Sequence, residues 1–302
     1  MTTGRQAATD SDRRSGPPVA MTIAGSDSGA GAGLQADLKA MSALGVFATT
    51  VVTAVTAQNT STVSAVHPVP PEIVDAQITA VLDDFAVGAV KTGMLATEAI
   101  VEVVAAHAAA GNLINLVVDP VLVASTGRLL LESRAIDAYR SRLLPHALIV
   151  TPNLYEAHIL AGAALDDATP GDIALMGALA ERIGEHGPTW VLVKGGHLPG
   201  VHEQDGSTAP DQVADVLWGP DGLTILEGSR VETANNHGTG CSLASATAAL
   251  LAWGLAVPEA VAGAKKFVNR ALVGAAGWHL GAGHGPLDPF GWSTHPAPPR
   301  TD

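Results

Sequence analysis

Short runs of apolar and β-branched residues recur along the chain and alternate with longer stretches in which Ala and Leu repeat at helical spacing. This alternation predicts a mostly parallel sheet covered by helices on both faces. The predicted strands are Val19 to Ile23, Thr49 to Val55, Ala89 to Lys91, Leu116 to Val118, Ala147 to Val150 and Trp190 to Val193. The clearest predicted helices are Leu34 to Leu44 and Leu243 to Trp253. The pattern therefore predicts an α/β fold.

Polar and glycine-rich segments follow six of these strands. In open α/β sheets, ligands bind outside the carboxyl ends of the strands. The segments at those ends are Gly25 to Gly29, Gln58-Asn59, Lys91 to Met94, Asp119-Pro120, Thr151 to Asn153 and Lys194 to Gly196. We therefore expect all six to point at one cleft.

Three segments lack this alternation of strand and helix patterns. Pro199 to Gly222 is polar and rich in Gly, Pro and Asp, so we expect a flap at residues 199–222 that includes a short hairpin near Val213 to Trp218. Residues 1–18 lack the apolar stretch of a signal peptide and are expected to be a disordered tail. Residues 292–302 contain three prolines and are expected to be a loose C-terminal tail. Residues 19–291 would then form one domain.

The composition narrows the function further. Of 302 residues, 47% are hydrophobic and 15% are charged, which is enough to bury a large core. The formal net charge of -13 disfavours binding to nucleic acid and to anionic lipid surfaces. No apolar run reaches the length of about 18 residues that a membrane span needs, and Cys241 is the only cysteine, which excludes an intrachain disulfide. We expect a cytoplasmic protein with no nucleic-acid or membrane partner.

The glycine-rich stretch Gly29 to Gly33 follows a strand and opens a predicted helix, as a dinucleotide-binding loop would. Its third glycine comes one residue too early, and the next strand ends in Thr56-Ala57-Gln58 with no acidic residue. Two interpretations remain open, a flexible strand-to-helix turn and a loop whose backbone approaches a ligand.

A different anion site is visible at Asn236 to Ser242, although the chain has no P-loop motif. Gly238 and Gly240 flank Thr239 and let backbone N–H groups converge, and the following helix adds the positive end of its dipole. Cys241 lies in the first turn of that helix, where the pKa of a thiol is typically lowered. A small buried hydrophobe is the alternative, but the preceding Gly-Thr-Gly favours a site.

Oxygen ligands for a metal ion are available at the same cleft. Asp119 and Glu156 are the two candidate metal ligands at the cleft, although either residue could instead cap a helix or face solvent. Asn153 and Lys194 could contact phosphate or be solvent-facing. The amide of Gln58 both donates and accepts and so matches the edge of an aminopyrimidine, or it belongs to a polar turn. The eleven histidines are scattered, so zinc is not supported.

Seven motifs in order along the chain resemble the hydroxymethylpyrimidine/phosphomethylpyrimidine kinase family of thiamine biosynthesis, from about residue 19 to about residue 275. The motifs are Thr22 to Ser28, Leu34 to Lys39, Thr53 to Thr60, Lys91 to Leu95, Thr151 to Leu154, Val193 to His197 and His237 to Cys241. The Ala-Val-Thr-Ala-Gln-Asn and His-Gly-Thr-Gly-Cys runs carry most of the specificity.

The resemblance implies a ribokinase-like three-layer α/β/α sandwich that uses ATP and Mg²⁺. It implies phosphorylation of the hydroxymethyl group of 4-amino-5-hydroxymethyl-2-methylpyrimidine, then of the monophosphate to the diphosphate, and a homodimer. It also implies a role for each matched residue. Gln58, Asp37, Gly25, Met94 and Val121 would bind the substrate, Asn153 and Lys194 the nucleotide, Asp119 and Glu156 the metal, and Cys241 would act with Gly238, Thr239 and Gly240 in catalysis.

The chain departs from the family pattern in several places. Asn235-Asn236-His237 replaces Asn-Thr-His, Ser125-Thr126-Gly127 replaces Lys-Ser-Gly, Gly29-Ala30 stands where Ser-Gly is expected, and the excursion after Gly196 is long. The missing lysine removes a phosphate contact, so the second phosphorylation is less well supported than the first.

Three other functions compete with this one. A pyridoxal kinase shares the fold and the cysteine site, and Gln58 favours the aminopyrimidine over it only moderately. A catalytically silent pyrimidine-binding regulator would not need the intact set of Asp119, Glu156 and Cys241. A NAD-dependent oxidoreductase lacks its glycine spacing and its acidic residue.

Overall fold

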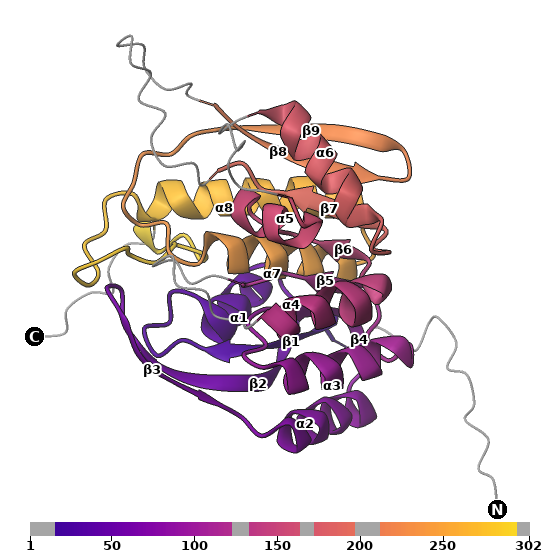
Figure 1. Cartoon of the computed structure of the whole chain (residues 1–302). Helices are drawn as coiled ribbons and strands as arrows, with labels where there is room; N and C mark the ends of the chain where they lie inside the picture. The colour runs from indigo at the N-terminus through magenta and orange to yellow at the C-terminus, as the bar shows by residue number, and fades with distance from the viewer. Residues whose placement is uncertain (1–15, 123–132, 164–171, 197–211, 295–302) are drawn as a thin grey trace, which may run out of the picture.

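The computed structural model describes residues 16–122, 133–163, 172–196 and 212–294 and is built on one nine-stranded sheet (Figure 1). The strands lie in the order β3-β2-β1-β4-β5-β6-β7-β8-β9. Their bounds are β1 Val19–Ser26, β2 Phe47–Gln58, β3 Val63–Pro68, β4 Val87–Thr92, β5 Leu116–Val118, β6 Ile149–Val150, β7 Trp190–Val193, β8 Gln212–Gly219 and β9 Gly222–Ser229.

The strands from β2 through β1 and β4 to β7 all pair in parallel. Antiparallel strands complete both edges, since β3 pairs with β2, and β8 pairs with β7 and then with β9. The parallel strands therefore end along one edge of the sheet, and the segments that follow them are brought together there.

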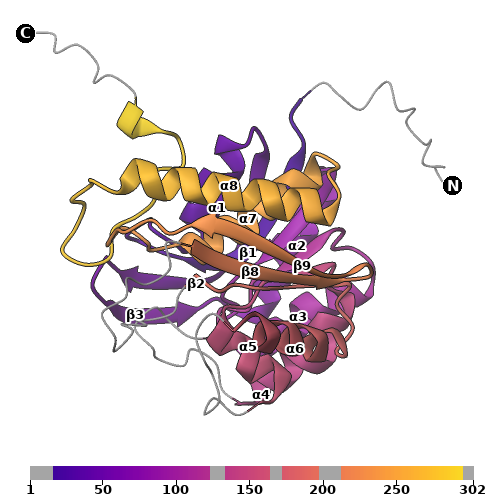
Figure 2. The same ribbon diagram turned by 90° about the horizontal axis from the view of Figure 1, so that it is seen from above.

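Helices cover both faces of the sheet. The longer helices are α1 Gly33–Ala43, α2 Pro71–Asp84, α3 Glu98–Ala109, α5 Leu154–Ala161, α6 Ile173–Gly184, α7 Thr239–Ala252 and α8 Val257–Ala275, and α4 Ser133–Ala138 is a short one. Figure 2 shows α1, α7 and α8 on one side and α3 to α6 on the other. Each face of the sheet has its own apolar core. One core contains residues of α1, α7 and α8, and the other contains residues of α2, α3, α5 and α6.

Helix α7 is buried because it lies between the sheet and α8. Its residues Ala244, Ala246, Ala248 and Ala249 are inaccessible to solvent, and their small side chains let the helix approach β4 and β5 closely. The N-terminus of α7 is consequently fixed at the edge where the parallel strands end.

This architecture confirms the predicted three-layer α/β/α fold and its six strands. Strands β3 and β9 were not predicted, because most of their residues are exposed and show no clear apolar alternation. The hairpin expected near Val213 to Trp218 is the first arm of the longer β8–β9 hairpin. Residues 199–211 of the expected flap and residues 1–15 of the expected tail lie outside the described residues.

The C-terminal boundary needs a correction. Trp292–Thr294 form one turn of 3₁₀ helix, and the amides of Trp292 and Ser293 donate to the carboxylate of Asp288 at 2.8 and 2.9 Å. The packed part of the chain thus reaches residue 294, and residues 295–302 lie outside the described residues. In the described part of the chain, no helix is long and apolar enough to cross a membrane.

Candidate active site

A cavity of about 1520 Å³ lies where the parallel strands end and extends along β8, β9 and α8. It brings together residues from every predicted site segment. Among the residues that line it are Gly25, Gln58, Met94, Asp119, Val121, Asn153, Glu156, Lys194, Gly238, Thr239, Gly240 and Cys241.

Asp37, which the resemblance placed in the substrate pocket, does not line the cavity. It is fully buried in α1, and its carboxylate accepts hydrogen bonds from Lys91 Nζ at 2.9 Å and from the hydroxyls of Thr22 and Ser245 at 2.6 Å each. Burial lowers the pKa of the Lys91 ammonium, but Asp37 and the nearby Cys241 and Asp119 raise it by more, so the net shift is upward. Asp37 therefore holds a permanent cation in the wall of the cavity.

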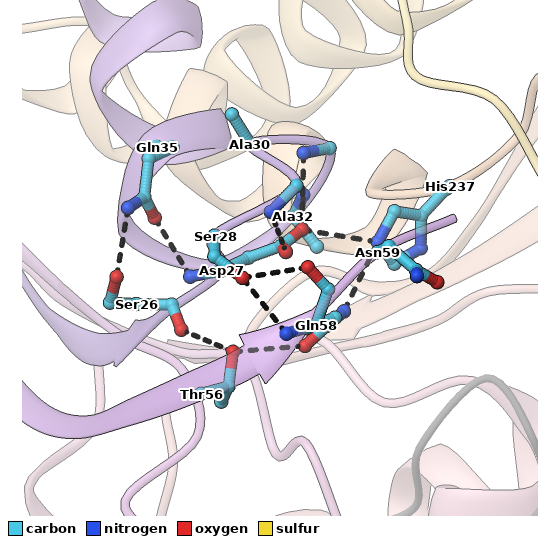
Figure 3. A network of polar contacts seen from close by, with 12 residues as sticks. Ser26, Asp27, Ser28, Ala30, Ala32, Gln35, Thr56, Gln58, Asn59 and His237 are labelled. Atoms are coloured by element: carbon cyan, nitrogen blue, oxygen red, sulfur yellow. Dashed lines mark hydrogen bonds and ion pairs between the residues drawn. The ribbon is translucent and has the colours of Figure 1, made fainter. Parts of the chain in front are cut away.

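The loop from Asp27 to Gly33 is organised around the carboxylate of Asp27 (Figure 3). That carboxylate accepts from the amides of Gly29, Gly31 and Ala32 at 2.8, 3.1 and 2.8 Å. Burial raises the pKa of Asp27, but hydrogen bonds from the His237 side chain and from backbone amides outweigh this, so the pKa lies below its usual value. The loop is a fixed turn, with φ of 57° at Ala30 and 56° at Gly33.

Gln58, the last residue of β2, is held by this loop. Its backbone N–H donates to Ser28 Oγ at 2.8 Å, and Ser28 Oγ donates to its carbonyl oxygen at 2.6 Å. Its side-chain amide lies between Thr56 and His237 at the cavity surface (Figure 3). Across the cavity wall, a Cβ at Gly25 would collide with the end of Met94, so a larger residue at Gly25 would displace that side chain.

The opposite end of the cavity carries the charged groups. Asp119 follows β5, is 3% exposed, and accepts hydrogen bonds from Lys194 Nζ at 3.1 Å and from Thr151 Oγ1 at 3.3 Å. Burial lowers the pKa of Lys194, but Asp119 and Glu156 raise it by more, so the net shift is upward. Lys194 therefore remains a cation at this end of the cavity.

Asn153 and Glu156 start helix α5 with a capping box. The Asn153 side chain accepts from the amide of Glu156, and the Glu156 carboxylate accepts from the amide of Asn153, both at 2.9 Å. Both side chains also line the cavity, so the capping role and the site role coincide. Burial and the neighbouring charge of Asp119 raise the pKa of Glu156 to about 7, although Lys194 acts in the opposite direction.

The N-terminus of α7 forms the wall between the two ends. Gly238 has a φ of 85°, which favours glycine, and a Cβ there would collide with the carbonyl oxygen of Gly31. Within the described residues, the amides of Gly240 and Cys241 have no hydrogen-bond acceptor. A Cβ on Gly240 would lie 3.1 Å from Lys194 Nζ, so these amides are adjacent to the cation.

The expected lowering of the Cys241 pKa is wrong for this structure. Burial raises the pKa of the thiol to about 11, and the charges of Asp119 and Asp37 act in the same direction. The Lys91 ammonium and the amide of Gly33 lower the pKa, but by less. The start of α7 is too desolvated and too close to carboxylates for its dipole to produce a thiolate.

Some residues of the site were not identified from the sequence. His237 lies between Asp27 and Gln58, and Lys265 of α8 forms an ion pair with Asp215 of β8 at 2.6 Å, while Asp215 accepts from the amide of Gly195 at 2.9 Å. For the buried ion pair between Lys91 and Asp37 the sequence did offer a signal, since a lysine inside an apolar strand implies a buried acidic partner. Ser125 to Gly127 lie outside the described residues.

Comparisons with known proteins identify the family of this chain. The family model described as phosphomethylpyrimidine kinase matches residues 27–288. A hydroxymethylpyrimidine/phosphomethylpyrimidine kinase from Streptomyces coelicolor is 46% identical over 277 residues, which is 92% of this chain and 96% of that protein.

Solved structures of similar proteins share the fold. A phosphomethylpyrimidine kinase from Clostridium difficile matches with a TM-score of 0.71 and 36% identity, covering 84% of this chain and 99% of that one. A pyridoxal kinase from Staphylococcus aureus in complex with AMP-PCP and pyridoxal matches with a TM-score of 0.77 and 34% identity, covering 92% and 95%. On the match to its family model and on the identity to its relatives, this chain belongs to the phosphomethylpyrimidine kinase family.

Proposed function

We propose that this protein transfers the γ-phosphoryl group of ATP to the hydroxymethyl group of 4-amino-5-hydroxymethyl-2-methylpyrimidine and then phosphorylates the monophosphate, as a step of thiamine biosynthesis. One observation carries the proposal. A single cavity has an amide suited to an aminopyrimidine at one end, phosphate-binding groups at the other, and the start of α7 between them.

The substrate end suits a small flat ring. Gln58 offers a donor and an acceptor side by side, which complements an exocyclic amine next to a ring nitrogen. Gly25, Met94 and Val121 add apolar surface to the lining of the same cavity. We assign these four residues to the substrate, and Asp37 contributes through Lys91 and not by contact.

The other end suits a nucleotide triphosphate. Lys194 supplies a cation, and the Asn153 side chain has its NH₂ group free of the capping interaction, which uses only its oxygen. We assign both residues to the ATP phosphates. The position of Lys194 Nζ beside Gly240, whose amide is free, supports the assignment of Lys194.

Asp119 and Glu156 fit a magnesium ion. Carboxylate oxygens are the ligands that Mg²⁺ prefers, and these two carboxylates line one end of the cavity. Burial and, to a lesser extent, the charge of Asp119 raise the pKa of Glu156, so a cation beside the two carboxylates would favour its ionised form. When bound, the ion would neutralise charge on the phosphate oxygens.

The start of α7 would stabilise the transferred group. As the substrate oxygen bonds to the γ-phosphorus and the bond to ADP breaks, the free amides of Gly240 and Cys241 would donate to the phosphoryl oxygens, with Gly238 and Thr239 forming the turn that presents them. A loose transition state needs little prior loss of the hydroxyl proton. A neutral Cys241 thiol therefore fits a role in positioning the hydroxyl better than a role as base.

The test is mass analysis of products after incubation with ATP, Mg²⁺ and the hydroxymethylpyrimidine, with pyridoxal in a parallel reaction. Diphosphate is the expected product. Monophosphate alone would confine the activity to the first step and would implicate Ser125, which replaces the family lysine. No pyrimidine product would refute the proposal.

Pyridoxal phosphorylation is a second candidate because a pyridoxal kinase shares this fold at 34% identity. Turnover of pyridoxal alone in the parallel reaction would establish it.

We also propose a cytoplasmic homodimer. Use of ATP supports the location. Val55, which is 52% exposed on strand β2, provides apolar surface for a second copy. Light scattering of the purified protein measures the mass directly.

A further inference from the structure

His237 lies between two side chains of the substrate end. Its Nε2 is 3.3 Å from Asp27 Oδ2 and 3.4 Å from Gln58 Nε2, and all three residues line the cavity (Figure 3). The three residues come from the turn after β1, from the end of β2 and from the segment before α7. A side chain in this position can control how Gln58 presents its amide.

The proton on His237 is fixed by Asp27. The Asp27 carboxylate is 4% exposed and receives three backbone amides, so it is ionised and can only accept. The His237 nitrogen that faces it must therefore carry the proton and donate. The same nitrogen cannot then accept from the NH₂ group of Gln58.

Thr56 leads to the same conclusion from the other side of the amide. Its hydroxyl lies 2.8 Å from the carbonyl oxygen of Ser26 and 3.4 Å from the oxygen of the Gln58 amide. A hydroxyl has one proton, and the shorter contact takes it. Thr56 Oγ1 can then only accept, so it needs the nitrogen of Gln58 opposite it and not the oxygen.

We propose that the Asp27–His237 pair orients the side-chain amide of Gln58, with its oxygen toward His237 and its nitrogen toward Thr56, and thereby selects the heteroaromatic substrate. In this orientation the single Nε2–H of His237 is shared between the Asp27 carboxylate and one lone pair of the Gln58 oxygen, and one N–H of the Gln58 nitrogen donates to Thr56. The remaining lone pair and N–H are free for a ligand.

The free lone pair and the free N–H of the Gln58 amide determine which ring can bind. It complements a ring that carries an amino group next to a ring nitrogen, as an aminopyrimidine does. A pyridine whose ring nitrogen has only carbon substituents beside it cannot satisfy both groups, and a polar group left unpaired in a binding site costs affinity. His237 is thus a positioning residue for substrate choice, an inference that rests on the proposed function.

Close packing against glycine backbone fixes the position of the His237 ring. A Cβ at Gly31 would lie 2.5 Å from His237 Cδ2, and a Cβ at Gly238 would collide with Gly31. Glycine at these two positions lets the ring pack directly on the turn. The glycine-rich stretch, which fits no dinucleotide site, thereby acquires a function in holding His237.

The test is His237→Phe, which keeps a flat ring on Gly31 and removes both nitrogens. We expect the KM for the pyrimidine to rise at least about tenfold, with the KM for ATP unchanged and kcat within about threefold. The matched control is His107→Phe on α3. His107 also bonds an aspartate, Asp75 at 2.8 Å, but does not line the cavity, so we expect no change. A fall in kcat with an unchanged pyrimidine KM would overturn the proposal.

A double-mutant cycle separates positioning from general damage. In a Gln58→Ala background, His237→Phe should change the pyrimidine KM by less than about twofold, because no amide remains to be oriented. Equal effects in both backgrounds would overturn the proposal.

The tautomer of His237 tests the hydrogen-bond assignment without any substrate. We expect ¹⁵N NMR of histidine-labelled protein to show the proton on Nε2, with the signal identified by its absence in His237→Phe. A proton on Nδ1 would overturn the assignment. Absence of pyrimidine turnover by the wild type would refute the proposed function, while the NMR result still decides the orientation of Gln58.

Discussion

At the scale of single residues, the site depends on groups that are buried together and cannot be changed separately. Lys91 and Asp37 are both inaccessible to solvent, and the remaining acceptor capacity of Asp37 is taken by Thr22 and Ser245. A buried ion pair contributes little net stability as a pair, but breaking one leaves an uncompensated charge. This asymmetry leads to a quantitative prediction.

Lys91→Met should lower the free energy of unfolding by about 3–5 kcal/mol, because Asp37 is left charged and unpaired in the core. Adding Asp37→Leu should recover much of that loss. Urea unfolding measures both. The matched control is Arg142→Met, since Arg142 forms an exposed ion pair with Glu102 and its loss should cost less than about 1 kcal/mol. A similar loss for both lysine and arginine variants would contradict the prediction.

Cys241 provides a second prediction at this scale. If the thiol positions the substrate hydroxyl, Cys241→Ser keeps a hydrogen-bonding group and should retain kcat within about tenfold, whereas Cys241→Ala should lose about a hundredfold. With a thiol pKa of about 11, ionisation of Cys241 should leave no inflection in kcat between pH 6 and 9. Equal losses in the serine and alanine variants, measured as kcat at saturating substrates, would argue for a thiolate base instead.

At the scale of elements, helix starts serve both stability and binding. Helices α5 and α6 begin with similar caps, because the Asn153 side chain accepts from the amide of Glu156 at 2.9 Å and the Asp172 side chain accepts from the amide of Leu175 at 3.0 Å. Only the first cap lies in the cavity. The two helices therefore allow the two roles to be separated.

Asn153→Ala and Asp172→Ala should each destabilise the protein by about 1 kcal/mol through loss of the cap. Only Asn153→Ala should also raise the KM for ATP, by about tenfold, because it removes the amide assigned to the phosphates. Thermal unfolding and steady-state kinetics on the same preparations check both parts. An unchanged KM for ATP in Asn153→Ala would remove Asn153 from the nucleotide site.

The positions of the strands explain which site residues could be predicted from the sequence and which could not. Gln58, Asn153 and Lys194 became candidates because each lies at or just after the end of a parallel strand, and such strands end at one edge. Asp37 lies in a predicted helix and was placed in the pocket by the resemblance alone, which does not give the direction of its side chain, and it is fully buried. Asp27 and His237 are 210 residues apart, and only the folded chain shows that they touch.

At the scale of the whole molecule, ligand binding should couple to global stability. The cavity is lined by residues from β1 through α8, so ligands contact segments spread over most of the described chain. Ligands that bind only the folded state shift unfolding by mass action. The raised pKa of Glu156 adds a pH dependence to this coupling.

The sign follows from the direction of that shift. The folded-state pKa of Glu156 is about 7 and the ordinary value is 4.5, so the folded protein binds this proton more tightly. The resulting stability is fully present below pH 4.5 and is lost as the pH rises through 7. Without Mg²⁺, wild-type stability should fall over this range more than that of Glu156→Gln.

The stabilisation of the protein by magnesium should increase with pH, because a carboxylate must lose its proton to bind the ion. Mg²⁺ with ATP should therefore raise the Tm more at pH 8 than at pH 6 in the wild type. Differential scanning calorimetry at both pH values provides the comparison. An equal increase in Tm at both values would show that Glu156 does not bind the ion.

The protonated state of Cys241 also has a consequence for how the protein tolerates oxidants. Peroxide reacts with thiolates, and a thiol with a pKa of about 11 supplies almost none at neutral pH. No second cysteine is present in the chain to resolve a sulfenic acid as an internal disulfide. A thiol that stays protonated at the proposed site of phosphoryl transfer should therefore react slowly with peroxide.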